Sequence, residues 1–109
     1  MRKAIILALA LAGSAHAEFV DGNKLLSQIK DSGYFSQGHA LGYIAGVADT
    51  GLGVIHCAPS NLTAGQLNDM VRNYLENTPA ERHLSADVTV NKVLKTVWPC
   101  QTRSRGNPA

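Results

Sequence analysis

The sequence predicts a small all-α domain of about four helices, stapled by one disulfide. Three observations support this fold class. Apolar residues recur at intervals of three and four through most of the chain after residue 17, which is typical of amphipathic helices. Capping residues, glycines and prolines mark where these segments begin and end. No segment shows the sustained alternation of a half-buried strand, so we expect none.

The first 17 residues have the pattern of a cleaved export signal. Met1-Arg2-Lys3 is a short basic start, residues 4–12 are an unbroken apolar run, and Ala15 and Ala17 suit a signal peptidase. The run is too short to cross a bilayer, which needs about 20 residues. We therefore divide the chain into a signal peptide (1–17), a helical domain (18–100) and a flexible tail (101–109), and expect a periplasmic protein.

Charge gives no reason to expect a nucleic acid or an anionic membrane as partner. The chain has ten Lys and Arg against eight Asp and Glu. Arg2 and Lys3 lie in the signal, so the mature chain is formally neutral when histidine is uncharged. A neutral chain lacks the basic patch that such partners require.

The first and third helices are predicted from their caps and apolar stripes. The capping sequence at Asp21 begins a helix that ends near residues 31–33 and carries Leu25, Leu26 and Ile29 on one side. Thr63 and Gln66 have the spacing of a capping box. The helix they begin ends before Pro79, and its stripe is Leu67, Met70, Val71, Tyr74 and Leu75.

The second helix is expected from about Tyr34 to about Leu52. Its apolar stretch is too short for a membrane span, and "GLGVIH" at 51–56 lacks the third glycine of a dinucleotide fingerprint. Gly38, Gly42 and Gly46 share one face, since residues four apart are neighbours on a helix. Each costs up to about 1 kcal/mol of helix propensity. We expect helix packing to compensate, and predict that this is the central, most buried helix.

The last helix follows the polar connector "PAERHL" at 79–84, which has room for one helical turn. Ser85 is its expected cap, and Pro99 ends it. Its four valines also suit a strand, but a spacing of three and four favours a helix. The stripe is Val90, Val93, Leu94, Val97 and Trp98.

The two cysteines, Cys57 and Cys100, predict one disulfide in an oxidising compartment. The chain-entropy model assigns a loop of this length about 4 kcal/mol of stabilisation. His56 stands beside Cys57, which leaves a reactive thiol or a metal pair as alternatives. A metal site, however, needs more ligands than cluster here.

The sequence shows no catalytic constellation, so we expect no enzyme, cofactor or metal site. His39, His56 and His83 are not placed with a nucleophile and an orienting group. His39 and Asp49 are roughly 15 Å apart along one predicted helix. The residues alone therefore indicate an exported helical binding domain with one disulfide.

Four motifs occur together in this chain: "DGNKLLSQI" (21–29), "ALGYIAGVAD" (40–49), "CAPSNLTAGQLNDMVRNYLENTPAERH" (57–83) and "VWPC" (97–100). Over about residues 19–100, the chain resembles the Rap/Tai immunity proteins. The resemblance implies a small helical periplasmic protein, often a homodimer, that binds a peptidoglycan amidase effector of a type VI secretion system. Such a protein covers the effector's catalytic cysteine and carries out no reaction itself.

The chain departs from this family in its cysteines. Members commonly carry a second cysteine pair, and Ile29 and Ala40 stand in or near those places here. We therefore expect a protein that keeps the fold with one bridge. The alternative function is a periplasmic acid-stress chaperone or envelope-stress binding protein of similar size and helicity.

Effector-contacting residues vary within such families, so the resemblance does not supply them. We place the effector-binding site on the connector from 77 to 85, with Glu81, Arg82 and His83 as its polar tips. A second candidate is the exposed face of the third helix, formed by Asn68, Arg72, Asn73 and Glu76. In the alternative interpretation, "ERHL" caps and braces the helix pair instead.

Overall fold

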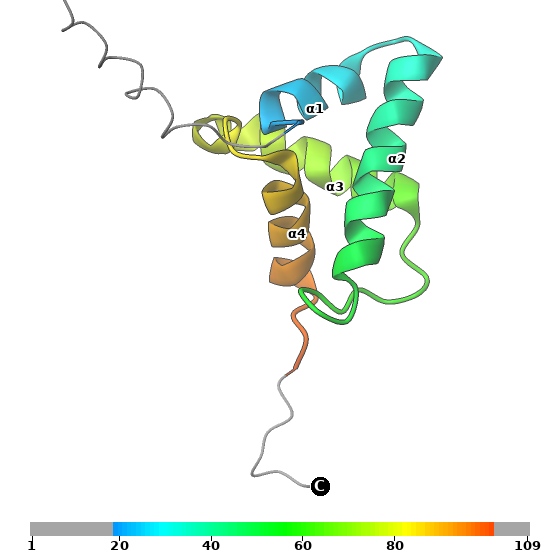
Figure 1. Cartoon of the computed structure of the whole chain (residues 1–109), viewed down its shortest axis with the longest axis vertical. Helices are drawn as coiled ribbons and strands as arrows, with labels where there is room; N and C mark the ends of the chain where they lie inside the picture. Colours follow the sequence, from blue (N-terminus) through cyan, green and yellow to red (C-terminus); the bar gives the residue numbers. More distant parts are fainter. Residues whose placement is uncertain (1–18, 102–109) are drawn as a thin grey trace, which may run out of the picture.

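The computed structural model describes residues 19–101 and shows four α-helices joined by short connections (Figure 1). The helices are α1 (Gly22–Lys30), α2 (Tyr34–Gly51), α3 (Ala64–Asn77) and α4 (Ala86–Val97), with the short 3-10 helix η2 (Pro79–Glu81) between the last two. Within these residues there is no β-strand, and the predicted all-α fold with one disulfide is confirmed. The predicted signal and nearly all of the predicted tail lie outside the described residues.

The helix boundaries follow local capping chemistry. The Asp21 carboxylate accepts a hydrogen bond from the Lys24 amide at 2.8 Å and begins α1. Thr63 and Gln66 form the predicted capping box, in which the Gln66 amide donates to the Thr63 hydroxyl and the Thr63 amide donates to the Gln66 side chain. Ser85 begins α4, but its hydroxyl donates to the Asp87 carboxylate instead of capping the helix.

The core lies where all four helices meet, since every pair of them is in contact. In Figure 1, α2 and α4 run along the two sides of the molecule, α1 lies at one end, and α3 crosses behind. The predicted stripes of α1, α3 and α4 supply most of this core, because each helix turns its apolar side inward. The fully or largely buried apolar residues are Leu25, Leu26, Ile29, Ala40, Ile44, Leu67, Val71, Leu75, Ala86, Val90 and Leu94.

The prediction that α2 is the most buried helix is wrong. Among its residues, Ala40, Ile44 and Gly51 are buried, whereas Leu41 is 38% exposed. The expected packing against Gly38, Gly42 and Gly46 is also absent within the described chain, because a Cβ atom at any of them would meet nothing within 4 Å. The physical reason is angular. Ala40 and Ile44 follow the first two of these glycines by two residues, or about 200° around the helix, so the glycines face away from the core.

The disulfide between Cys57 and Cys100 is confirmed. It joins the loop after α2 to the chain that follows α4, and the Cα atoms of the two cysteines are 4.9 Å apart. The Cys57 amide also donates to the Trp98 carbonyl at 2.8 Å. This bridge therefore closes the end of the molecule opposite the α3–α4 connector.

Candidate functional site

The connector between α3 and α4 is a tightly braced corner, which we call the 78–85 corner. Pro79 opens η2, where its fixed φ suits a first helical position. The Gly22 amide donates to the Leu84 carbonyl at 3.0 Å, and the Asn23 amide donates to the Arg82 carbonyl at 2.9 Å. These bonds satisfy first-turn amides of α1 that have no partner within their own helix.

Gly22 allows this close approach. A Cβ atom there would lie 2.8 Å from the Arg82 carbonyl oxygen and 2.9 Å from the Leu75 side chain. The distance to the carbonyl oxygen is too short for a side chain without a shift of the backbone, and the Leu75 side chain would also have to move. The beginning of α1 is therefore fitted against the corner by a glycine.

The Arg82 side chain closes the end of α3. Its Nε donates to the Leu75 carbonyl at 2.7 Å, and its Nη2 donates to the Glu76 carbonyl at 3.0 Å. The last carbonyls of a helix lack partners within it and carry partial negative charge. A guanidinium at this place stabilises the helix terminus, so Arg82 acts within the fold.

Glu81 ties α3 to α4. Its carboxylate accepts a hydrogen bond from the Tyr74 hydroxyl at 2.6 Å and an ion-pair contact from the Lys92 ammonium at 3.2 Å. The Tyr74 hydrogen bond, followed by the Lys92 ammonium, lowers the pKa of the Glu81 carboxyl. Like Arg82, this residue is occupied internally, which agrees with the bracing interpretation of "ERHL".

His83 differs from its two neighbours because its side chain is exposed on the turn after η2. The structure thus separates the three predicted tips: two brace the corner and one faces solvent.

The second candidate surface, the outer face of α3, contains two groups of residues. Arg72 and Lys30 of α1 both pair with Glu76, at 3.3 and 3.5 Å. Asn73 lies further round the helix and accepts from the Asn77 side-chain amide. Asn68 is half-buried between these groups and the core. The four residues predicted for this face therefore form one solvent-facing surface with polar contacts along the helix.

Asn73 also lies at a groove between α3 and α4 that the sequence analysis missed. The groove has a volume of about 250 Å³ and is lined by Met70, Asn73, Tyr74, Val93, Thr96 and Val97. Val97 is 50% exposed, although it belongs to the predicted apolar stripe of α4. The only signals in the sequence were that Met70 lies at the edge of its stripe and that Val97 lies close to Pro99, which ends its helix.

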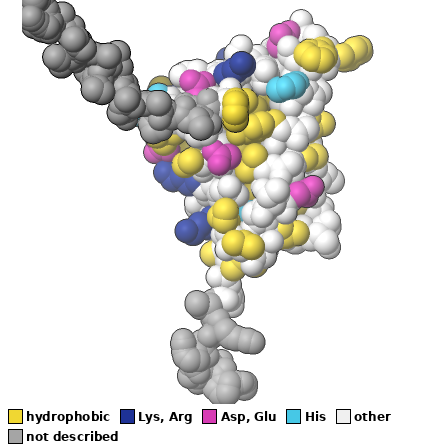
Figure 2. Space-filling model, in the orientation of Figure 1, with side chains coloured by type: hydrophobic (Ala, Val, Ile, Leu, Met, Phe, Trp, Pro, Cys, Tyr) yellow, Lys and Arg dark blue, Asp and Glu magenta, His cyan; other side chains and the backbone are white. Residues whose placement is uncertain are grey.

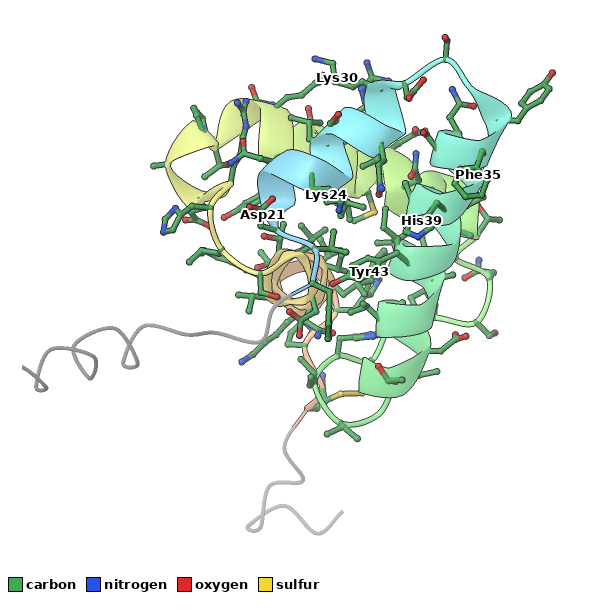
Figure 3. The ribbon with its side chains drawn as sticks, turned by 45° about the horizontal axis from the view of Figure 1, so that its top comes forward. Asp21, Lys24, Lys30, Phe35, His39 and Tyr43 are labelled. Atoms are coloured by element: carbon green, nitrogen blue, oxygen red, sulfur yellow. A yellow bond between two sulfur atoms is a disulfide. The ribbon has the colours of Figure 1, made fainter. Side chains whose placement is uncertain are left out.

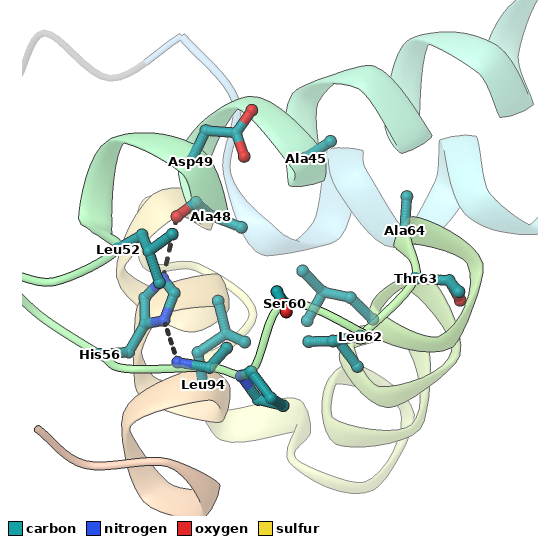
Figure 4. Close-up of a pocket in the computed structure, with 13 residues that line it drawn as sticks. Ala45, Ala48, Asp49, Leu52, His56, Ser60, Leu62, Thr63, Ala64 and Leu94 are labelled. Atoms are coloured by element: carbon teal, nitrogen blue, oxygen red, sulfur yellow. Dashed lines mark hydrogen bonds between the residues drawn. The ribbon is translucent and has the colours of Figure 1, made fainter.

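A second cavity lies between the C-terminal half of α2 and the beginning of α3, and we call it the α2 cleft (Figure 4). Its volume is about 280 Å³. Aliphatic side chains form most of its wall, and Asp49 lies at its rim. The lining residues are Ala45, Ala48, Asp49, Leu52, His56, Ala58, Pro59, Ser60, Leu62, Thr63, Ala64, Leu67 and Leu94.

His56 holds one wall of the α2 cleft and is only 1% exposed. Its Nε2 donates to the Ala48 carbonyl at 2.9 Å, and its Nδ1 accepts from the Ala58 amide at 3.2 Å. These two bonds select the neutral tautomer with its proton on Nε2. The sequence left a reactive thiol or a metal pair as alternatives to the disulfide here, but His56 instead caps the last turn of α2. In the described part of the chain, histidines, cysteines and carboxylates form no group of three that could hold a metal ion.

The family model of the Rap1a immunity proteins matches residues 21–100 of the 109 in this chain. The chain belongs to the Rap1a immunity protein family. A comparison with curated proteins found no match. Membership makes the chain an immunity protein that binds a secreted effector protein.

In this Rap1a family member, the matched range contains every candidate residue described above. The bracing bonds of Glu81 and Arg82 show how they maintain the shape of the corner. His83 and the outer face of α3 are the parts of the predicted site that face solvent, and the groove beside Asn73 adjoins that face. None of the helices of residues 19–101 is both long and apolar enough to cross a membrane.

Proposed function

We propose that this protein is a periplasmic immunity protein that binds a peptidoglycan amidase effector and blocks its active-site cleft sterically. The match to the Rap1a immunity proteins over residues 21–100 is the observation that carries the proposal. The export pattern of residues 1–17 supports the location. The disulfide supports it as well, because such bonds persist in oxidising compartments. We further propose that the protein acts as a homodimer, as its resemblance to the family implies.

The effector-binding surface in this proposal is the outer face of α3 with the groove beside it. The groove has an apolar floor that includes Met70 and Val93, and a polar edge at Asn73 and Thr96. An apolar centre with a polar rim is the usual anatomy of a protein interface. His83 lies on the turn after η2, beyond the end of α3, and we include its exposed side chain in the proposed surface.

A rescue assay in living cells tests the proposed function. A periplasm-targeted amidase effector is expressed together with the full chain or with a chain that lacks residues 2–17. Lysis should stop only with the full chain. If a folded and exported protein leaves lysis unchanged with every amidase effector tested, the amidase proposal is wrong. Rescue by the truncated chain would instead contradict the periplasmic location.

The binding surface is tested separately with purified proteins. Asn73→Arg places a long charged side chain at the groove and should weaken effector binding at least tenfold. Asn23→Arg, at an exposed position of α1, is the matched control and should leave affinity unchanged. Circular dichroism should show the same helix content for both variants. Equal affinities would move the binding surface away from α3 without affecting the rescue result.

A further inference from the structure

The outer side of α2 carries a protrusion at one end and a cavity at the other. At its N-terminal end, the side chains of Tyr34 and Phe35 are 92% and 84% exposed. Apolar side chains project at the corner where α1 turns into α2 (Figure 2). Phe35 lies one turn before His39, with their ring centroids 6.2 Å apart (Figure 3). The α2 cleft opens at the C-terminal half of the same helix.

The protrusion and the α2 cleft are about equally far from Gly42. Tyr34 and Phe35 precede Gly42 by eight and seven residues, and the cleft residues Asp49 and Leu52 follow it by seven and ten. At 1.5 Å per residue, these separations are about 10–15 Å along the helix. A two-fold axis through Gly42 would therefore place Tyr34 and Phe35 of one copy over Asp49 and Thr50 of another.

The α2 cleft has the size and lining for an aromatic ring. Its volume is about 280 Å³, and an apolar cavity of roughly 150 Å³ already holds benzene. Leu52 and Leu62 provide apolar wall, and the carboxylate of Asp49 lies at the rim. A tyrosine could thus bury its ring there while its hydroxyl donates to Asp49, which is the pairing that a buried tyrosine needs.

The electrostatics of this side suit self-association. Between residues 32 and 68, Asp49 is the sole Asp, Glu, Lys or Arg. Figure 2 shows no Lys or Arg side chain over α2 in that view. Two copies therefore meet with little like-charge repulsion, and His39 of one copy lies about 6 Å along the helix from the level of Asp49 of the other. Interface cores are likewise poor in charge and rich in aromatic residues.

We propose that a second copy of this chain docks antiparallel along α2, with Tyr34 and Phe35 of each copy seated at the other's α2 cleft. The interface is isologous, since the same residues serve both copies. Gly42 marks the two-fold axis, and the glycine face lets the two helices approach closely because no side chain intervenes. This inference supplies the surface for the homodimer in the proposed function and needs no effector.

Sedimentation equilibrium of the purified full chain tests the assembly. The protein should be a dimer at micromolar concentration. Tyr34→Ser with Phe35→Ser should raise the dimer dissociation constant at least tenfold and leave the helix content unchanged. Phe19→Ser is the matched control, because Phe19 is also 89% exposed. A wild-type protein that stays monomeric at roughly 100 μM, a concentration above the dissociation constant of a specific dimer, would overturn the proposal. A dimer whose dissociation constant does not change with the double substitution would overturn it as well.

Cysteine cross-linking tests the position of the two-fold axis. Helix axes 8–10 Å apart bring facing Cα atoms to about 3.5–5.5 Å, which overlaps the range of a disulfide. Gly42→Cys should therefore form a covalent dimer on mild oxidation. Gly65→Cys is the control, because a side chain there also meets nothing within 4 Å but lies on α3. Equal cross-linking of both variants would contradict this interface, whereas the rescue assay would still judge the immunity function independently.

Discussion

The 78–85 corner and the outer face of α2 are both at the surface, yet they are built in opposite ways. At the corner, charged side chains bond to backbone carbonyls and to one another, and α1 is fitted against the turn through Gly22. The face of α2 has three glycines with nothing opposite them and a single formal charge, Asp49. The corner thus uses its polar groups to hold the fold, whereas α2 leaves apolar surface uncovered by the other residues of 19–101.

This difference shows that charge and exposure do not identify a binding residue by themselves. Glu81 and Arg82 looked like recognition residues because they are charged and lie in a connector. Both are occupied by contacts within the chain. The residues open to a partner are instead those whose side chains have no internal task, such as Tyr34 at the end of α2.

The largest expected effect comes from removing the disulfide, which joins the loop after α2 to the chain that follows α4. The double change Cys57→Ser with Cys100→Ser should lower the free energy of unfolding by about 4 kcal/mol, because it releases a loop of 43 residues. Urea unfolding followed by circular dichroism measures the loss. The wild type in reducing buffer should behave like the variant. A loss below about 1 kcal/mol, the size of a single ordinary hydrogen bond, would mean that packing alone fixes the loop after α2.

The same substitution at two glycines should have opposite signs. Gly22→Ala places a Cβ atom 2.8 Å from the Arg82 carbonyl oxygen and should destabilise the fold by about 1–3 kcal/mol through overpacking. Gly42→Ala meets no atom and should stabilise the monomer by up to about 1 kcal/mol through helix propensity. Thermal unfolding at submicromolar concentration compares them. Equal signs would remove the contrast between the two regions.

Substitutions at two arginines compare the stability contributed by a bracing residue of the 78–85 corner with that of an exposed residue of α3. Arg82→Met removes both bonds to the carbonyls at the end of α3 and should lower the free energy of unfolding by about 2 kcal/mol. Arg72→Met removes an exposed ion pair with Glu76 and should cost at most about 0.5 kcal/mol. Chemical denaturation gives both values. If both changes cost the same, Arg82 does not brace the corner.

The smallest expected effect is the pH dependence at Glu81. Tyr74 and Lys92 lower the pKa of this carboxyl in the folded protein below its ordinary value of 4.5. Its contribution to stability is therefore present above about pH 4.5 and lost as pH falls through the folded value. Glu81→Gln should flatten the decline of stability between pH 5 and pH 3, and Tyr74→Phe should flatten it partly. An unchanged decline in both variants would show that the corner is held by Arg82 and backbone bonds alone.

Most of the fold could be predicted because local chemistry determines it. Thr63 with Gln66 begins α3, Pro79 limits its end, and the 3/4 spacing of apolar residues identified the buried sides of α1, α3 and α4. The disulfide was predicted from the even number of cysteines and from the export pattern of the first 17 residues. These signals act over a few residues or through simple counting.

The rest depends on tertiary contacts that no local pattern encodes. Glycines on α2 indicate a face without side chains, but the sequence does not say whether that face meets the core. In the structure, this face points away from the core. The Arg82 side chain reaches back seven residues to α3, and His56 reaches back eight to α2. Neither spacing belongs to a recognised motif. The sequence could therefore nominate segments for the candidate site, but could not separate bracing residues from exposed ones.

The corner sets different limits on change at two adjacent positions. Arg82 joins two helices, since its side chain ends α3 and its carbonyl accepts from the Asn23 amide of α1. His83 has an exposed side chain. An immunity protein whose effector diverges must diverge with it, and mutations that cost little stability are the ones such a lineage can accumulate. We expect the residue at position 83 to vary among descendants of this protein and the arginine at position 82 to stay the same. New specificity can then arise next to a residue that maintains the fold.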